Sequence, residues 1–143
     1  MTTRRAFLMA GPLLAMMSQM GGMALRNAAA EARRVLVERA AAAWDVIVSA
    51  DTLVYFGDLR QTLHAAAQAL KPRGWLGFTL ENLDVTEDRV QLAPSGRYQH
   101  SRRHVEAALG EAGLELVSIQ ADSLRKEVGL PVPGWVVIAR RVL

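Results

Sequence analysis

The strongest constraint on the fold is an alternation of apolar runs and an amphipathic stripe between residues 45 and 80. Residues 45–50 form a short run rich in β-branched side chains, which indicates a buried strand of a parallel sheet. From about Asp58, leucine and alanine recur at helical spacing and predict an amphipathic helix. Residues 71–74, Lys-Pro-Arg-Gly, should end that helix, and residues 75–80 should form the next strand. A strand, a crossover helix and a second strand make a βαβ unit, so the sequence predicts an α/β fold.

The polar stretch after this unit predicts a loop and then a second helix. Residues 82–100 contain Pro94 and Gly96 and should form a long loop beyond the carboxyl end of the second strand. Ser101 is a favourable N-cap residue, and the apolar residues that follow it at helical spacing predict a helix that Gly113 ends.

The last part of the chain predicts two further strands. Residues 114–121 and 135–142 are apolar runs, and Pro131, Pro133 and Gly134 between them are expected to form a hairpin-like return. The predicted order is therefore strand, helix, strand, long loop, helix, strand, strand. This order predicts an α/β fold whose sheet ends in an antiparallel pair of strands.

The N-terminal segment, residues 1–43, carries two competing patterns. Arg4 and Arg5 precede an apolar run, which resembles a twin-arginine export signal and is too short to predict a membrane span. The alternative is a methionine-rich amphipathic helix that packs on the domain. Residues 24–43 lack proline and glycine and predict a further helix. The sequence thus divides into this helical segment and an α/β part, residues 44–143.

Composition excludes several classes of function. With 51% hydrophobic and 22% charged residues, the 143-residue chain has the balance of a single globular domain. Because the chain has no cysteine, it contains no disulfide, no thiolate zinc site and no cysteine nucleophile. The net charge of +3 comes with arginine pairs that are scattered along the chain, so no nucleic-acid site is predicted.

Five short motifs carry a resemblance to a known family. They are Trp-Asp-Val-Ile-Val-Ser-Ala-Asp-Thr-Leu at 44–53, Leu-Lys-Pro-Arg-Gly at 70–74, Asp-Thr-Leu-Val-Tyr-Phe-Gly-Asp-Leu at 51–59, Phe-Thr-Leu-Glu at 78–81 and Ser-Gly-Arg-Tyr-Gln-His-Ser at 95–101. With the element order above, they resemble the C-terminal half of class I S-adenosylmethionine-dependent methyltransferases. The motifs look most like predicted methyltransferases attached to tetratricopeptide repeats. The resemblance covers residues 44–141 and implies a partial Rossmann-like sheet.

The resemblance also implies a cofactor site. In the family, the loop after the matching strand passes under the methionine part of S-adenosylmethionine, and the matching positions here are Ser49, Ala50, Asp51 and Thr52. Open α/β sheets bind ligands beyond the carboxyl ends of their strands, which agrees with this placement. The alternative for Asp51 is that it caps the next helix, because aspartate is a frequent N-cap residue.

Four residues on the same side of the predicted sheet are candidates for the acceptor site: Glu81, Arg97, Tyr98 and His100. A carboxylate, an imidazole and a phenol suit the orientation of an acceptor or the handling of its proton. The alternative for each is an ordinary salt-bridged loop. His100 and His104 have the helical spacing of metal ligands, but no third ligand lies nearby in the sequence, so no metal site is predicted. No catalytic residue is assigned, because positioning supplies much of the rate of methyl transfer.

The sequence departs from the family at the cofactor motif. No Gly-x-Gly-x-Gly pattern occurs, so we expect a truncated methyltransferase whose isolated activity is doubtful and whose methyl acceptor is unknown. The alternative is a non-catalytic α/β binding module. Under either interpretation the family's first strands, which would lie beside residues 45–50, are missing, so this strand is expected to be a sheet edge. Such an edge favours a homo-oligomer or a complementing chain unless residues 5–43 cover it. Because the implied cofactor is cytoplasmic, we expect a cytoplasmic protein, with export as the alternative.

Overall fold

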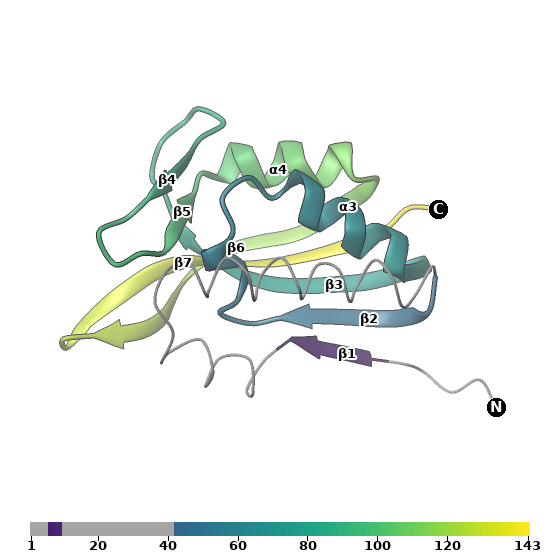
Figure 1. The fold of residues 1–143 in the computed structure, drawn as a ribbon, viewed down its shortest axis with the longest axis horizontal. Helices are drawn as coiled ribbons and strands as arrows, with labels where there is room; N and C mark the ends of the chain where they lie inside the picture. Colours follow the sequence, from purple (N-terminus) through teal and green to yellow (C-terminus); the bar gives the residue numbers. More distant parts are fainter. Residues whose placement is uncertain (1–5, 10–41) are drawn as a thin grey trace.

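The computed structural model describes residues 6–9 and 42–143, which form a seven-stranded mixed sheet with two α-helices (Figure 1). In chain order the elements are β1 (Ala6–Met9), β2 (Trp44–Ser49), the 3-10 turn η1 (Leu53–Tyr55), α3 (Arg60–Ala69), β3 (Leu70–Asn82), β4 (Val90–Leu92), β5 (Tyr98–His100), α4 (Arg102–Glu111), β6 (Leu114–Glu127) and β7 (Leu130–Arg141).

Strands β1, β2 and β3 are parallel neighbours, and α3 is the crossover between β2 and β3. On the other side of β3, β7 runs antiparallel to it, and β6 runs antiparallel to β7. The βαβ unit and the antiparallel finish predicted from the sequence are therefore confirmed. All three parallel strands end at the same edge of the sheet, which is where α/β sheets bind ligands.

The start of the chain corrects one prediction. Residues 6–9 belong to the apolar run for which one prediction was a packing helix, but they form a strand in register with β2, from Ala6 opposite Val46 to Met9 opposite Ser49. Strand β2 is therefore not the edge of the sheet. A four-residue apolar run is compatible with a helix or a strand. It forms a strand here because the backbone groups along one side of β2 need hydrogen-bond partners. The remaining N-terminal predictions concern residues 1–5 and 10–41, which lie outside the described residues.

Both α-helices pack on the same face of the sheet (Figure 1). The side chains buried between them and the strands each remove apolar surface from water, which is worth about 1.5–3 kcal/mol for a large aliphatic residue. The largest members of this core are Ile47, Leu63, Leu76, Phe78, Leu80, Val105, Leu109 and Val137. Among the described residues, no helix is both long and apolar enough to cross a lipid bilayer.

Helix α4 begins as predicted. The Oγ of Ser101 accepts the His104 backbone N–H at 3.2 Å, which satisfies one of the free donors of the first turn. The same oxygen accepts the Arg89 backbone N–H at 3.0 Å and so ties the preceding loop to the helix. After the helix, Gly113 has a φ of +74°, a left-handed backbone that glycine adopts without cost.

The β6–β7 hairpin turns at a different place from the one predicted. Its two turn residues are Val128 and Gly129, with φ of 50° and 77°, and the proline-rich segment lies inside β7. Pro131 and Pro133 are tolerated there because β7 pairs with β3 only from Gly134 onward, so the prolines lie where one side of the strand has no neighbour. Each strand of the hairpin is therefore longer than the sequence pattern indicated.

Two segments predicted as irregular are also extended. The predicted turn at residues 71–74 lies inside β3, where Arg73 has a φ of 63° and the register with β2 shifts between Trp44 and Val46. The predicted loop at residues 82–100 contains β4 and β5, which pair with each other and attach to the end of β3. At residues 71–74 the irregular backbone is accommodated by a bulge in the pairing with β2. At residues 82–100 the chain becomes extended where β4 and β5 pair with each other and β5 pairs with β3.

Candidate functional site

The residues at the carboxyl ends of β2 and β3 form what we call the carboxyl rim, residues 49–52 together with Glu81. Asp51 has a left-handed φ of 51°, and its backbone N–H donates to Thr79 Oγ1 at 2.9 Å. The loop after β2 is therefore tied to β3. The N-cap residue of α3 is Leu59, so the alternative that Asp51 caps this helix is wrong.

The rim holds an orphaned polar atom. Ser49 is 2% exposed, and its Oγ has no hydrogen-bond partner in the part of the chain that the structure describes. Buried hydroxyl groups are nearly always paired, so an unpaired one is a candidate contact for a bound molecule. Next to it, Thr52 is buried and its hydroxyl donates to Ala50 O at 3.0 Å, which tightens the loop.

The carboxylates of the rim are joined by an arginine that sequence analysis missed. Arg125, from β6, donates through Nη1 to Asp51 Oδ1 at 2.8 Å and through Nη2 to Glu81 Oε1. Its Nε donates to Glu127 Oε1 at 2.9 Å. Although burial alone lowers it, the pKa of Arg125 is raised by the hydrogen bonds that it donates to Glu127 and Glu81, so the guanidinium remains charged.

Arg97 extends this network to the β4–β5 connection. Its Nη1 donates to Glu127 Oε1 at 2.6 Å, so one carboxylate oxygen is shared by two guanidinium groups. The hydrogen bond from Arg125 holds the pKa of Glu127 below its usual value. Two predicted rim residues and Arg97 thus belong to one charged network, which we call the rim network: Asp51, Glu81, Arg97, Arg125 and Glu127.

His100 lies in a different environment. Its ring is fully buried, and Nε2 lies 3.0 Å from Phe56 O and 2.8 Å from Gly57 O. Burial lowers the pKa of His100 to about 4, so the ring is neutral at physiological pH and Nε2–H is the donor to these carbonyls. His100, which the sequence predicted as a contact for the methyl acceptor, therefore connects the segment after η1 to β5. Tyr98 lies nearby, because a side chain at Gly57 would begin 3.4 Å from its ring.

His104 forms a second buried contact beside His100. Its Nε2 accepts the Leu59 backbone N–H at 3.2 Å, and Nδ1 lies 2.7 Å from Asp88 Oδ1, whose pKa this hydrogen bond lowers. The two imidazole rings are 5.7 Å apart between centroids. Within residues 6–9 and 42–143, no group of three or more metal-ligating side chains could hold an ion. We call His100, His104 and Asp88 the histidine network.

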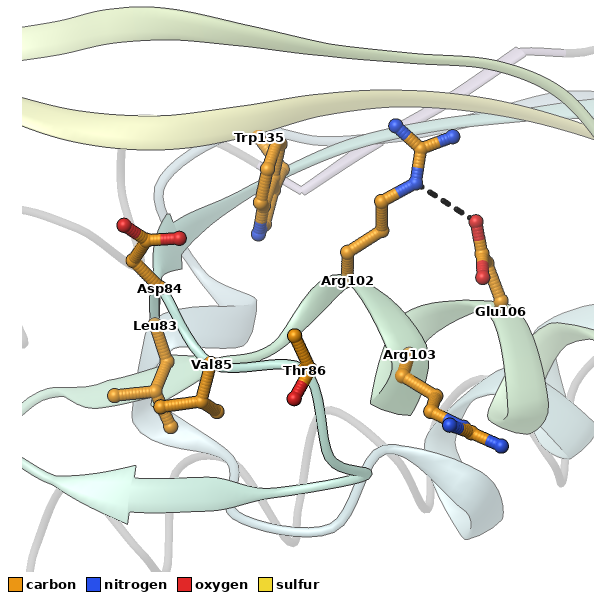
Figure 2. A pocket seen from close by; sticks show the side chains of 8 residues that line it. All are labelled: Leu83, Asp84, Val85, Thr86, Arg102, Arg103, Glu106 and Trp135. Carbon is orange, nitrogen blue, oxygen red and sulfur yellow. Dashed lines mark hydrogen bonds and ion pairs between the residues drawn. The ribbon is translucent and has the colours of Figure 1, made fainter.

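A pocket of about 550 Å³ lies beyond β3, at the N-terminal end of α4 (Figure 2). Trp135 forms one wall, and its Nε1 donates to His100 O at 3.1 Å. Arg102 is held by Glu106 at 2.8 Å on the opposite side. The pocket is lined by Leu83, Asp84, Val85, Thr86, Arg102, Arg103, Glu106 and Trp135. Its first lining residue, Leu83, follows Glu81 of the carboxyl rim by two positions in the chain.

The structure therefore brings only some of the predicted residues together. Asp51, Glu81 and Arg97 share the rim network, whereas Tyr98 and His100 lie against the segment after η1. Arg125 and Glu127 were overlooked because residues 122–134 were assigned to the return between two strands. A bulge between Ser123 and Arg125 interrupts the alternation of β6 there, so no local pattern marked these two residues.

Solved structures with this fold are S-adenosylmethionine-dependent methyltransferases and related proteins. A methyltransferase from Methanosarcina mazei matches with 15% identity, a TM-score of 0.57, and coverage of 74% of this chain and 63% of the other. The 1,6-didemethyltoxoflavin-N1-methyltransferase of Burkholderia thailandensis, solved with S-adenosylhomocysteine, matches with 16% identity, a TM-score of 0.59, and coverage of 76% and 48%. The cyclase SpnF matches with 15% identity, a TM-score of 0.58, and coverage of 73% and 52%.

These matches define the fold. The chain has a Rossmann-like α/β fold of the class I methyltransferase type, and it spans about half to two thirds of the length of the structures it matches. No protein-family model and no curated protein matches the sequence. Because the cyclase has the same fold as the methyltransferases, function has to be argued from the site.

Proposed function

We propose that this chain is part of an S-adenosylmethionine-dependent methyltransferase. The observation that carries the proposal is the order and direction of the main strands, β1-β2-β3-β7-β6, with three parallel strands followed by an antiparallel pair. The methyltransferases it matches share this fold at TM-scores of 0.57 and 0.59. The motifs at residues 44–53, 78–81 and 95–101 support the same family.

The carboxyl rim suits the methionine part of the cofactor. Ser49 Oγ is buried and unpaired among the described residues, and Asp51 presents a carboxylate at the same edge. Small side chains at Ser49 and Ala50 allow a ligand to approach the backbone. In this proposal residues 49–52 bind the cofactor, which supplies an electrophilic methyl group, and the protein contributes mainly by positioning the two reactants.

The residues around β5 form the proposed binding site for the methyl acceptor. Tyr98 and Arg97 are partly exposed, so they remain candidates for direct contact with an acceptor. Glu81 and His100 are buried and hydrogen-bonded, so we assign them to positioning, Glu81 through Arg125 and His100 through the carbonyls after η1. The pocket beside Trp135 is the proposed place for the acceptor.

The alternative function is a non-catalytic α/β module that binds a ligand or a partner. Two observations favour it: the sequence has no Gly-x-Gly-x-Gly motif, and both rim carboxylates are already paired with Arg125. In this case a complementing chain would pair with β1, the strand at the end of the sheet order.

Isothermal titration calorimetry with S-adenosylmethionine and S-adenosylhomocysteine separates the two functions. A methyltransferase should bind them with dissociation constants well below about 1 mM, which corresponds to about −4 kcal/mol. Asp51→Asn should weaken binding, whereas Glu115→Gln, an exposed carboxylate on β6, should leave it unchanged. Absence of binding at millimolar cofactor would contradict the methyltransferase proposal and favour the binding module.

Two finer proposals follow from the sequence resemblance. We place the protein with the methyltransferases associated with tetratricopeptide repeats, and we place it in the cytoplasm, where S-adenosylmethionine is made. Fusion of the first forty residues to a reporter tests the second point, because translocation of the reporter would favour the twin-arginine alternative.

A further inference from the structure

The end of the β6–β7 hairpin, residues 122–133, extends beyond the sheet on the side toward which β1 and β2 point (Figure 1). We call this segment the arm. Within the arm, β7 pairs only with β6, because its ladder with β3 begins at Gly134. A two-stranded ribbon without further support is only marginally stable in water, so its position depends on the contacts it makes with the rest of the domain.

A β-bulge at the base of the arm directs Arg125 toward the rim. The register of β6 and β7 shifts between Ser123 and Arg125, which leaves Leu124 without a partner on β7. Leu124 fills the space above Gly134, where an added side chain would overlap it and would lie 2.5 Å from Leu80 O. Bulges increase strand twist and re-aim side chains, and here the twist turns the following residue toward the ends of β2 and β3.

Arg125 connects the arm to both strand ends. It binds Asp51 at 2.8 Å and Glu81, while its own strand supplies Glu127 at 2.9 Å. The Arg125 side chain is 20% exposed and that of Glu81 is 6% exposed, so these ion pairs are shielded from solvent more than ordinary surface pairs. Arg97 gives the arm a second anchor through Glu127.

We propose that Arg125 is a latch that holds the arm across the carboxyl rim, and that a ligand reaches the rim only when this latch opens. The consequence for ligand binding rests on the proposed function. The physical reason is that the guanidinium engages Asp51 Oδ1 and Glu81 Oε1 together, so a ligand that uses either of these oxygens first has to replace Arg125. The latch positions these carboxylates when closed and exposes residues 49–52 when open.

The absence of cysteine allows a direct test in the full chain. Ala50→Cys places a single thiol in the rim loop, next to Asp51, and its rate of alkylation by iodoacetamide reports access to the rim. Adding Arg125→Gln should raise that rate about tenfold. The carboxylates of Asp51, Glu81 and Glu127 then repel one another without the guanidinium, so the arm moves away from the rim. Arg125→Lys keeps the charge but loses the fork of donors, so it should give an intermediate rate.

A matched control separates the latch from loss of folding. Ala108→Cys places the thiol in α4 at a position that is 0% exposed, where alkylation requires opening of the core. Arg125→Gln should leave the Ala108→Cys rate unchanged. Equal Ala50→Cys rates with and without Arg125→Gln would overturn the latch. A parallel rise at both reporters would also overturn it, because Arg125 would then support the whole fold.

Ligand binding gives the second readout. S-adenosylhomocysteine should bind about tenfold more tightly to Arg125→Gln than to the unaltered chain, because the competing ion pairs are gone. Weaker binding would make Arg125 a ligand-binding residue and would overturn the latch. Absence of binding to either protein would contradict the proposed function, and the alkylation rates alone would then decide whether the latch exists.

Discussion

The histidine network and the rim network are both built from polar groups near the end of the sheet, but they differ in exposure and charge. His100 and His104 are at most 1% exposed, and each ring hydrogen-bonds to backbone or to Asp88. In the rim network, the Asp51 side chain is 34% exposed and that of Arg125 is 20% exposed. The two imidazole rings are closed to solvent, whereas Asp51 and Arg125 are partly exposed.

This difference separates fully buried polar groups from partly exposed ones. A fully buried imidazole is held neutral by its desolvation, so His100 acts as a fixed hydrogen-bond donor. A partly exposed ion pair keeps its charges and can exchange its partner for a ligand at a modest cost. Both networks contain residues that the sequence marked as site candidates, and these residues differ in burial. Four predictions test this contrast.

The largest expected effect is the acid sensitivity of the histidine network. His100 has a pKa of about 4 in the folded protein against 6.5 for the free side chain. Between these values the unfolded chain binds a proton that the folded chain does not, so stability is complete above about 6.5 and falls as the pH falls toward 4. The loss is up to about 3 kcal/mol, to be measured by urea unfolding at several pH values.

Two variants isolate this contribution from that of other groups. His100→Asn should flatten the dependence of the free energy of unfolding on pH in that range. His64→Asn, at an exposed position on α3, should leave the dependence as it is. Identical pH profiles for His100→Asn and the unaltered chain would show that burial of His100 does not cause the acid sensitivity. The contrast drawn between the two networks would then not hold.

The next effect concerns the base of the arm. Gly134→Ala should lower the free energy of unfolding by about 2–3 kcal/mol, because its Cβ would lie against Leu80 O, a backbone atom that cannot move aside. Gly110→Ala is the matched control, since nothing lies within 4 Å of a Cβ there and alanine favours the helix by about 0.5–1 kcal/mol. Chemical denaturation measures both, and a Gly134→Ala chain as stable as the control would show that the arm is not fixed at this point.

A smaller effect is expected on the histidine side, at the cap of α4. Ser101→Ala removes the acceptor of the His104 and Arg89 backbone N–H groups and should cost about 1–2 kcal/mol. Ser95→Ala, at an exposed loop position, should change stability by less than about 0.5 kcal/mol. Thermal unfolding compares the two, and equal melting temperatures would mean that the helix start does not depend on this cap.

The smallest effect lies at the tip of the arm. Val128 is fully exposed and has a φ of 50°, which a β-branched residue adopts only at a cost. Val128→Asn should therefore raise the free energy of unfolding by about 1 kcal/mol, because asparagine suits this kind of hairpin turn. Val142→Asn serves as the control at an exposed position without this backbone conformation. A lower melting temperature for Val128→Asn would point to a contact at the tip that the valine makes.

Local patterns in the sequence predicted much of the fold. The apolar run before Ser49, the helical stripe after Asp58 and the cap at Ser101 each specify an element through backbone preference and hydrophobic spacing, which act over a few residues. The βαβ unit and the antiparallel finish follow from the order of these elements. The prediction that residues 49–52 and Glu81 share one edge of the sheet also follows, because parallel strands end on the same side.

Tertiary structure decided the rest. Residues 6–9 form a strand only because β2 offers an unpaired edge, and the hairpin turns at Val128 although the sequence puts its turn-forming prolines further on. Arg125 reaches Asp51 across 74 positions of the chain, through a bulge that no local pattern revealed. Sequence by itself determined most of the segments that form elements and the edge of the sheet at which residues 49–52 and Glu81 lie, whereas pairing and burial between distant residues decided which side chains meet there.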